Sequence, residues 1–136
     1  MPTETSKVQP LRIADAHRSI RHVFVRDLDV MASIGVYATE IDSPQKIRIN
    51  VDLSVDDSKP IVEGDLSTVV CYDTVVRQIR TIVTSGHLFL VETLAERIAD
   101  MVLQDRRIYA ARIRVEKLEA IADTTSVGVE IERFAE

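Results

Sequence analysis

The sequence predicts an α+β domain with the element order ββααββ, a four-stranded antiparallel sheet that carries two helices on one face. Three observations predict it. Four segments alternate apolar and polar residues, which is the two-residue period of a strand. Between the second and third segments the apolar period changes to that of two successive helices. Short, hairpin-like connections favour antiparallel pairing, and shared apolar faces favour packing the helices on one side.

The chain has 136 residues, of which 46% are hydrophobic and 29% charged, and this fits one globular domain with a modest core. Residues 1–19 mix proline with charged residues without a sustained period. We expect a flexible or peripheral extension there, with room for a short helix near residues 11–20. Residues 20–136 then form the single domain.

The first strand begins at His22 and ends at Gly35. Its apolar residues share one parity, interrupted by Arg26: Phe24, Leu28, Val30, Ala32 and Ile34. After the loop of residues 36–44, the second strand, residues 46–55, alternates strictly between apolar and polar side chains. That pattern is typical of a half-buried strand.

A polar connector, residues 56–67, leads to two helices. The apolar stripe of the first is Val75, Val76, Ile79, Ile82 and Val83, and Gly86 is placed to end it. The stripe of the second is Val91, Leu94, Ala95, Ile98 and Val102. Alternation returns in residues 111–116 and 127–132, which predicts the last two strands.

The second face of this sheet is strongly polar. It carries Lys46, Arg48, Asn50, Asp52, Arg112, Arg114, Glu116, Glu130 and Glu132. Such a face is either solvated or lines a shared wet interior. An open sheet of four strands also leaves two edges, and self-association into a ring would relieve both.

Composition excludes several functional classes. A net charge of −5, with arginines scattered among acids, argues against a nucleic-acid partner, as does the absence of tryptophan. Cys71 is the single cysteine, so an intrachain disulfide and a cysteine zinc site are excluded, and the spacing of the three histidines does not suit zinc. Without a membrane span or a signal-peptide pattern, we expect a cytoplasmic protein with a small-molecule partner.

Two charged residues interrupt apolar patterns. Lys117 continues the inward parity of the third strand, so its ammonium either extends to water or lies in a pocket where it can transfer protons. Glu92 follows an apolar run at the start of the second helix. There it either complements the helix dipole or binds a planar ligand that presents two adjacent N–H donors.

Two further residues complete a candidate site. Tyr72, directly before the first helix, is either a packed surface tyrosine or a proton donor. Glu40, in the loop after Gly35, is by its pattern alone a solvated acid. The residues thus predict a site of Lys117, Glu92, Tyr72 and Glu40 without naming its substrate.

Around these residues the sequence resembles the dihydroneopterin aldolase family of folate biosynthesis. Five stretches carry the resemblance in the same order as in the family: DLDVMASIGVYATE (27–40), QKIRINVDL (45–53), VVCYDTV (69–75), LVETLAERIA (90–99) and IRVEK (113–117). Residues 1–19 lie outside it. One departure is Leu118, where family members often have a proline after the lysine.

The resemblance implies the tunnel-forming T-fold, with residues 20–136 as the catalytic domain. It implies rings of four subunits, commonly stacked in pairs, and active sites between neighbours. By the same resemblance Glu92 anchors the pterin, assisted by Val91, Val70 and Val36. Lys117, Tyr72 and Glu40 match the family's catalytic positions.

The implied reaction is a retro-aldol cleavage of 7,8-dihydroneopterin that needs neither a metal nor another cofactor. Zinc-dependent pterin enzymes with this fold use a histidine cluster that the sequence lacks. Two alternatives stay open. One is an epimerase acting on dihydroneopterin or its triphosphate, and the other is a non-catalytic pterin-binding protein with the same fold.

Overall fold

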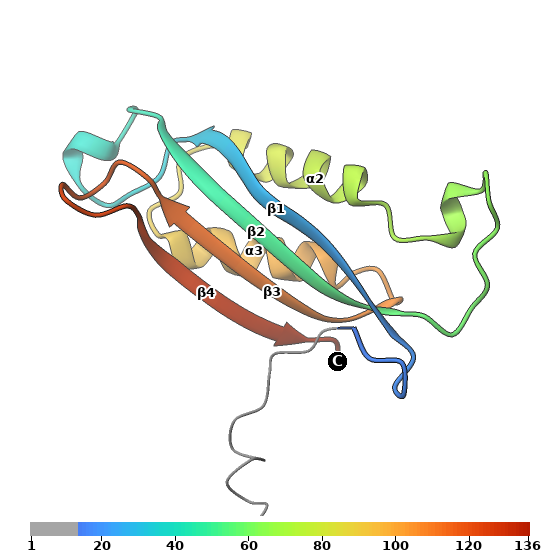
Figure 1. Cartoon of the computed structure of the whole chain (residues 1–136). Coiled ribbons are helices and arrows are strands. Elements are labelled where there is room, and N and C mark those ends of the chain that lie inside the picture. Colours follow the sequence, from blue (N-terminus) through green and yellow to red (C-terminus); the bar gives the residue numbers. More distant parts are fainter. Residues whose placement is uncertain (1–13) are drawn as a thin grey trace, which may run out of the picture.

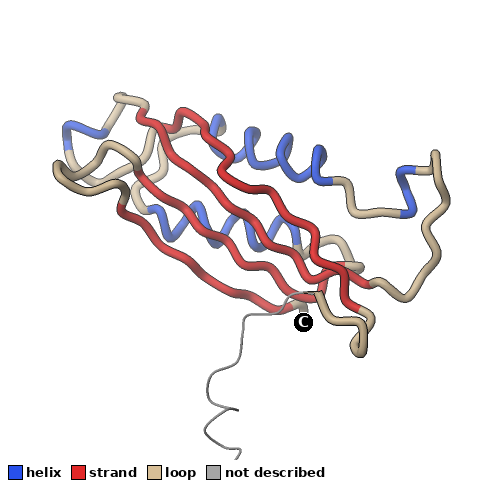
Figure 2. Tube along the Cα trace, in the orientation of Figure 1, coloured by secondary structure: helices blue, strands red, loops and turns tan. Residues whose placement is uncertain are grey.

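The structure, a computed structural model, describes residues 14–136. Within them a single antiparallel sheet has the order β1 (Ile20–Ala32), β2 (Gln45–Asp56), β3 (Ile108–Lys117) and β4 (Val127–Phe134). Helices α2 (Tyr72–Thr84) and α3 (Val91–Val102) lie along one face of it (Figures 1 and 2). Two short 3-10 helices, η1 (Ala38–Glu40) and η2 (Leu66–Thr68), interrupt the loops. The predicted α+β class and ββααββ order are confirmed.

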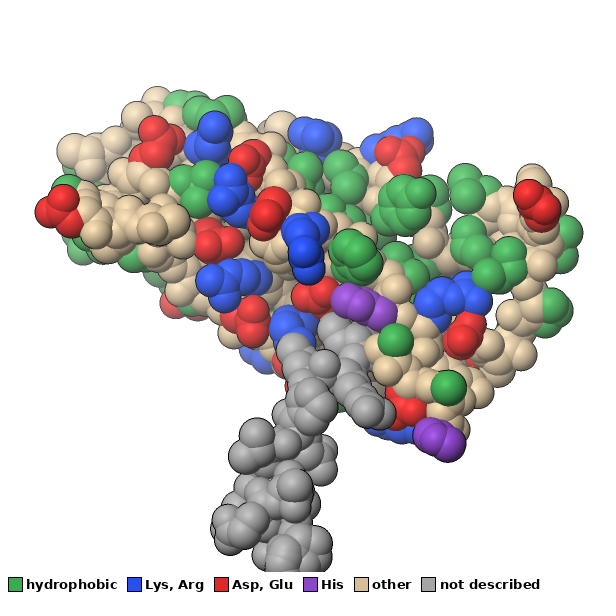
Figure 3. Space-filling view, in the orientation of Figure 1, with side chains coloured by type: hydrophobic (Ala, Val, Ile, Leu, Met, Phe, Trp, Pro, Cys, Tyr) green, Lys and Arg blue, Asp and Glu red, His purple; other side chains and the backbone are tan. Residues whose placement is uncertain are grey.

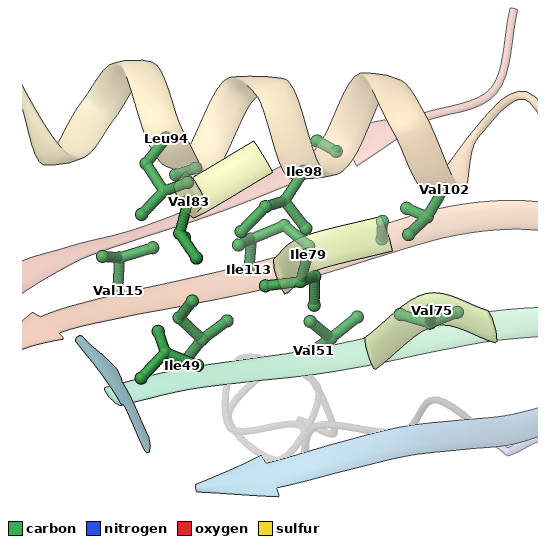
Figure 4. Close-up of a cluster of buried hydrophobic side chains, with 14 of the residues drawn as sticks. Ile49, Val51, Val75, Ile79, Val83, Leu94, Ile98, Val102, Ile113 and Val115 are labelled. Atoms are coloured by element: carbon green, nitrogen blue, oxygen red, sulfur yellow. The ribbon is translucent and has the colours of Figure 1, made fainter. Parts of the chain in front are cut away.

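The core fills the space between the sheet and the two helices (Figure 4). Alternate residues of β2 point into it, as do the stripes that the sequence assigned to the helices, except for Val76. The side chains with no exposed surface include Ile47, Ile49, Val51, Ile79, Leu94, Ile98, Ile113 and Val115. This packing fixes the directions of β3 and α3, the two elements that carry Lys117 and Glu92.

The single parity predicted for the first strand is wrong at Phe24. A bulge between Val25 and Leu28 shifts the register, so Phe24 is 52% exposed whereas Val25 packs against the core. Asp27 has a positive φ of 54° there, and its backbone N–H and carboxylate both pair with the side chain of Asn50 (2.9 and 3.0 Å). Because a bulge adds one residue to one strand, the parity reverses across it.

The limits of β1 also differ from the prediction. The strand begins at Ile20 and its regular pairing ends at Ala32, three residues before Gly35. The described part of the expected helix near residues 11–20 is instead a turn, because the Asp15 carboxylate accepts hydrogen bonds from two following backbone N–H groups. The rest of that helix lies outside the described residues.

The sheet face opposite the helices is covered by charged side chains of both signs (Figure 3). Many are paired across strands: Arg48 with Asp29 at 2.8 Å, His22 with Asp52 at 2.7 Å and Arg112 with Glu132 at 2.9 Å. The polar face predicted from the alternation is therefore real, and its charges largely balance locally. No helix within residues 14–136 has the length and apolar character required to cross a membrane.

Candidate active site

Lys117 and Glu40 form an ion pair at one end of the sheet. Lys117 is the last residue of β3, opposite Ile47 of β2, and so keeps the parity of the buried face. Its Nζ donates to Glu40 Oε2 at 2.8 Å, and the two side chains are only 16% and 13% exposed. The Lys117 side chain is therefore largely buried beside a carboxylate and does not extend to bulk water.

Glu40 accepts two further hydrogen bonds. It ends η1, where its Oε1 accepts a hydrogen bond from the backbone N–H of Tyr37 at 3.3 Å. Gln45 Nε2 donates both to Glu40 Oε2 at 3.0 Å and to the carbonyl of Ile34 at 2.8 Å. The glutamate is therefore not a solvated loop acid, and sequence reasoning missed Gln45, whose position at the start of β2 carried no signal of this contact.

These contacts keep Glu40 ionised. The hydrogen bond from Lys117 lowers the pKa of the Glu40 carboxyl below its ordinary 4.5, and the bond from Gln45 lowers it further, whereas burial opposes both. Hydrogen bonds to the charged form of a carboxyl stabilise that form. Lys117 therefore lies beside a carboxylate near neutral pH.

Gly35 provides the surface against which this carboxylate packs. A Cβ added to Gly35 would lie 2.1 Å from the Glu40 carboxyl carbon, and the residue has φ = +134°. Both the contact and the conformation exclude a larger side chain. The sequence suggested Gly35 only as the end of a strand, but here it is a requirement for the position of Glu40.

The ion pair lies in an open pocket of about 420 Å³. Its other walls are Tyr37, Ser43, Pro44, Glu119, Ile121 and Val127. The size is within the usual range for small-molecule sites. At its edge, Leu118 donates its backbone N–H to the carbonyl of Lys46 at 3.3 Å, a bond that a proline in this position would not make.

Glu92 lies at the same end of the sheet. It is exposed in the first turn of α3, the helix whose start is tied to the chain leading to Glu40. The ties are two backbone bonds, from Gly35 to the carbonyl of Leu88 at 2.9 Å and from Leu88 to the carbonyl of Ser33 at 3.0 Å. Figure 1 shows η1, the end of β3 and the start of α3 together at the left.

Tyr72 lies at the opposite end. It is 65% exposed at the start of α2, whose 13 residues extend about 18 Å along the sheet. The segment before it is bound to the start of β3, where Arg107 Nη1 donates to the carbonyl of Val69 at 3.0 Å. Within one chain, therefore, the structure brings together Lys117, Glu40 and the start of α3 but not Tyr72.

The three valines of the predicted site, Val36, Val70 and Val91, are likewise distributed between the two ends of the sheet. Val36, 53% exposed, follows Gly35, and the half-buried Val91 is the first residue of α3. Val70 is 7% exposed and lies with Tyr72 before α2. Val36 and Val91 therefore lie at the Lys117 end of the chain, whereas Val70 lies with Tyr72 at the opposite end.

A model of the dihydroneopterin aldolase family matches residues 23–132, which contain every candidate residue. The chain belongs to the dihydroneopterin aldolase family. Among curated members, it is similar to the dihydroneopterin aldolase of Escherichia coli K12, with 31% identity over 82% of this chain and 91% of the relative. A dihydroneopterin triphosphate 2′-epimerase of the same organism is 26% identical over 77% of this chain and 88% of its own.

Two solved structures of dihydroneopterin aldolases have the same fold. The enzyme from Burkholderia thailandensis bound to guanine has a TM-score of 0.77 and 33% identity, covering 88% of this chain and 94% of its own. The Escherichia coli enzyme in complex with neopterin also has a TM-score of 0.77, with 30% identity over 83% of this chain and 98% of its own. Membership in the family therefore agrees with the fold of the chain.

This end of the molecule combines two kinds of chemistry. The Lys117–Glu40 pair offers proton transfer beside a pocket, and Glu92 offers a carboxylate that can accept two parallel N–H bonds. No group of three or more His, Cys, Asp or Glu side chains in residues 14–136 is arranged to hold a metal ion.

Proposed function

We propose that the chain cleaves 7,8-dihydroneopterin by a retro-aldol reaction to 6-hydroxymethyl-7,8-dihydropterin and glycolaldehyde. One observation carries this proposal. The half-buried ion pair of Lys117 and Glu40, with 2.8 Å between Nζ and Oε2, lies at the end of the sheet where α3 presents Glu92. Membership in the family supplies the substrate class, and the pair supplies an acid–base group next to it.

The substrate provides its own electron sink. The side-chain 2′-hydroxyl loses its proton, the bond between C1′ and C2′ breaks, and the electrons of that bond enter the ring imine. Glycolaldehyde leaves, and the resulting enamine takes up a proton at C1′. The protein therefore has to bind the ring and move two protons, which positioned acid–base groups accelerate by about 10² to 10⁴ each.

We assign the first proton transfer to Lys117, whose neutral amine takes the 2′-hydroxyl proton through a water molecule and becomes an ammonium. Glu40 fixes the position of its Nζ and stays ionised, so its negative charge remains beside the transferring proton. Tyr72 of the partner subunit would supply the proton that the enamine takes up. This assignment brings Lys117 of one chain and Tyr72 of the partner subunit, which lie at opposite ends of the sheet in each chain, into one site.

We assign the pterin ring to the start of α3. The ring presents a 2-amino group and an adjacent N3–H, two donors that match the two oxygens of Glu92. Guanine, the ligand named for the Burkholderia structure, presents the same pattern of donors. Val91 and Val36 would contact the ring from the same chain, and Val70 from the partner subunit.

The separation of Tyr72 from Lys117 supports a site shared between copies. We propose a ring of four chains, alone or stacked as eight, in which the sheets line a common tunnel. The charged sheet face then becomes the wall of that tunnel (Figure 3). Joining β1 of one copy to β4 of the next would also satisfy the two open edges.

A product assay tests the function directly. Purified full-length protein is incubated with 7,8-dihydroneopterin, and both glycolaldehyde and the pterin products are measured. We expect stoichiometric glycolaldehyde and 6-hydroxymethyl-7,8-dihydropterin. Formation of the monapterin isomer without cleavage would favour the epimerase, an alternative that the 26% identical relative supports. Pterin binding with neither product would favour a non-catalytic pterin-binding protein.

A further inference from the structure

His87, which the proposed mechanism does not use, connects the two parts of the candidate site. It lies in the short turn between α2 and α3, half-buried, with its ring edge against Phe89. Its Nε2 is 2.8 Å from the carbonyl oxygen of Gly35, and its Nδ1 is 2.6 Å from Ser33 Oγ. Both partners belong to the segment that leads from β1 to Glu40.

The hydrogen-bond partners of His87 determine which of its ring nitrogens carries a hydrogen. A carbonyl oxygen only accepts, so Nε2 carries a hydrogen and donates it to Gly35. In the neutral ring Nδ1 then accepts the hydroxyl hydrogen of Ser33. His87 thus clamps Gly35 with a side-chain bond, in addition to the backbone bonds that join Leu88 to Ser33 and Gly35.

A short chain of contacts leads from this clamp to the ion pair. The bare Cα of Gly35 is the surface against which the Glu40 carboxylate packs, and Glu40 in turn accepts from Lys117. In the other direction along the sequence, Glu92 follows His87 by five residues, at the start of α3. A shift of Gly35 would therefore move the ion pair relative to Glu92.

We propose that His87 is a positioning residue, which holds the Lys117–Glu40 pair at a fixed place relative to the pterin-binding start of α3 by clamping Gly35. This inference rests on the proposed function. Because a displacement of about 1 Å can cost about 100-fold in rate, such a clamp would act on turnover more than on binding.

Variants at position 87 whose side chains differ in length test whether the hydrogen bond to Gly35 is required. Glutamine can place an N–H near the position of Nε2, whereas asparagine reaches only as far as Nδ1. We expect His87→Ala and His87→Asn to lower kcat about 10- to 100-fold with KM little changed, and His87→Gln to retain most of kcat. His17→Ala is the control, because His17 is exposed in the turn before β1 at the opposite end of the sheet.

A second readout does not require turnover. Loosening of the ion pair should raise the pKa of the Glu40 carboxyl toward 4.5 in His87→Ala, and carbon-detected NMR titration of that carboxyl measures it. Should the alanine variant not fold, the comparison of His87→Asn with His87→Gln replaces it. Melting temperature gives the folded fraction, so that kcat is expressed per folded molecule.

Three results would overturn the inference. They are equal kcat per folded molecule in all variants, equal losses in the glutamine and asparagine variants, and a Glu40 pKa that no variant changes. A wild-type protein that releases no glycolaldehyde would refute the proposed function instead. The titration of Glu40 would then still decide whether His87 positions the pair.

Discussion

Lys117 and Glu40 are both half-buried, and each is the ion-pair partner of the other. Their separation of 77 residues along the chain explains why sequence patterns did not pair them. The parity of β3 predicted correctly that Lys117 points toward the buried face, but parity gives no information about the partner. Glu40 was even less predictable, because the contacts with Gln45 and Gly35 that hold it form only once the loop is folded.

The Glu40 carboxyl should make stability depend on pH. Its pKa in the folded chain lies below the ordinary 4.5, so its contribution to stability is present above pH 4.5 and is lost as pH falls through the folded value. In Lys117→Met the carboxyl loses its main partner, and we expect its pKa to rise. NMR titration of the carboxyl in both proteins measures this, and an unchanged pKa in the variant would contradict the pairing.

Gly35→Ala should change the position of the Glu40 carboxylate without altering either charged side chain. The new Cβ would meet the carboxylate at 2.1 Å in a backbone conformation that alanine avoids, so the loop must move. We expect a loss of about 1–3 kcal/mol in the free energy of unfolding and a fall in kcat, although Lys117 and Glu40 are both intact. Gly64→Ala is the control for kcat, because Gly64 also has a positive φ (+87°) but nothing lies within 4 Å of the Cβ that it would add. An unchanged kcat would show that the contact is not required.

At the scale of elements, the sequence predicted whether a segment is a helix or a strand better than it predicted the segment's first and last residues. The stripes of α2 and α3 follow from a period that a long helix repeats several times, so most of their residues were predicted; Val76 is not part of the core, and the buried Ala99 was missed. The bulge in β1 depends instead on one side-chain contact between Asp27 and Asn50, which no period encodes. Phe24 was misplaced for this reason.

Arg107 sets the position of the segment before α2. Its guanidinium binds Asp105 (2.6 and 2.9 Å) and donates to the carbonyls of Ser67 and Val69 at 3.0 Å each. We expect Arg107→Met to lower the free energy of unfolding by about 1–3 kcal/mol, because these carbonyls lose a charged donor. Denaturant unfolding measures the loss.

A matched variant tests whether the loss comes from that anchor. Arg106 precedes Arg107 and is exposed, so Arg106→Met should change the free energy of unfolding by less than about 0.5 kcal/mol. Equal effects of the two substitutions would show that the hydrogen bonds of Arg107 do not anchor the segment.

On the scale of the whole molecule, the candidate site is incomplete in one chain. The residues alone predicted one site of Lys117, Glu92, Tyr72 and Glu40. Only the resemblance placed such sites between subunits. Within one chain, the segment before Tyr72 is bound to the start of β3, whereas Lys117 is the last residue of that strand. No pattern within a chain shows whether a second copy supplies Tyr72 to the site.

Mixing two inactive variants should restore activity if neighbouring copies share a site. Lys117→Met and Tyr72→Phe are each expected to lose most of their turnover. In a ring assembled from equal amounts of both, about a quarter of the sites would combine an intact Lys117 with an intact Tyr72 of the partner subunit. Co-refolding the two proteins and measuring glycolaldehyde release tests this. Activity no higher than the average of the two parents would contradict a shared site.

The central claim is that Glu92 binds the pterin ring while Lys117 moves its protons. Measuring pterin affinity and glycolaldehyde release side by side for Glu92→Gln and Lys117→Met tests it most directly. We expect Glu92→Gln to weaken binding about 10-fold or more, because a charged hydrogen-bond acceptor is lost. Lys117→Met should still bind the pterin but lower kcat by about 10² or more. Full turnover in Lys117→Met, or unchanged pterin affinity in Glu92→Gln, would contradict the account.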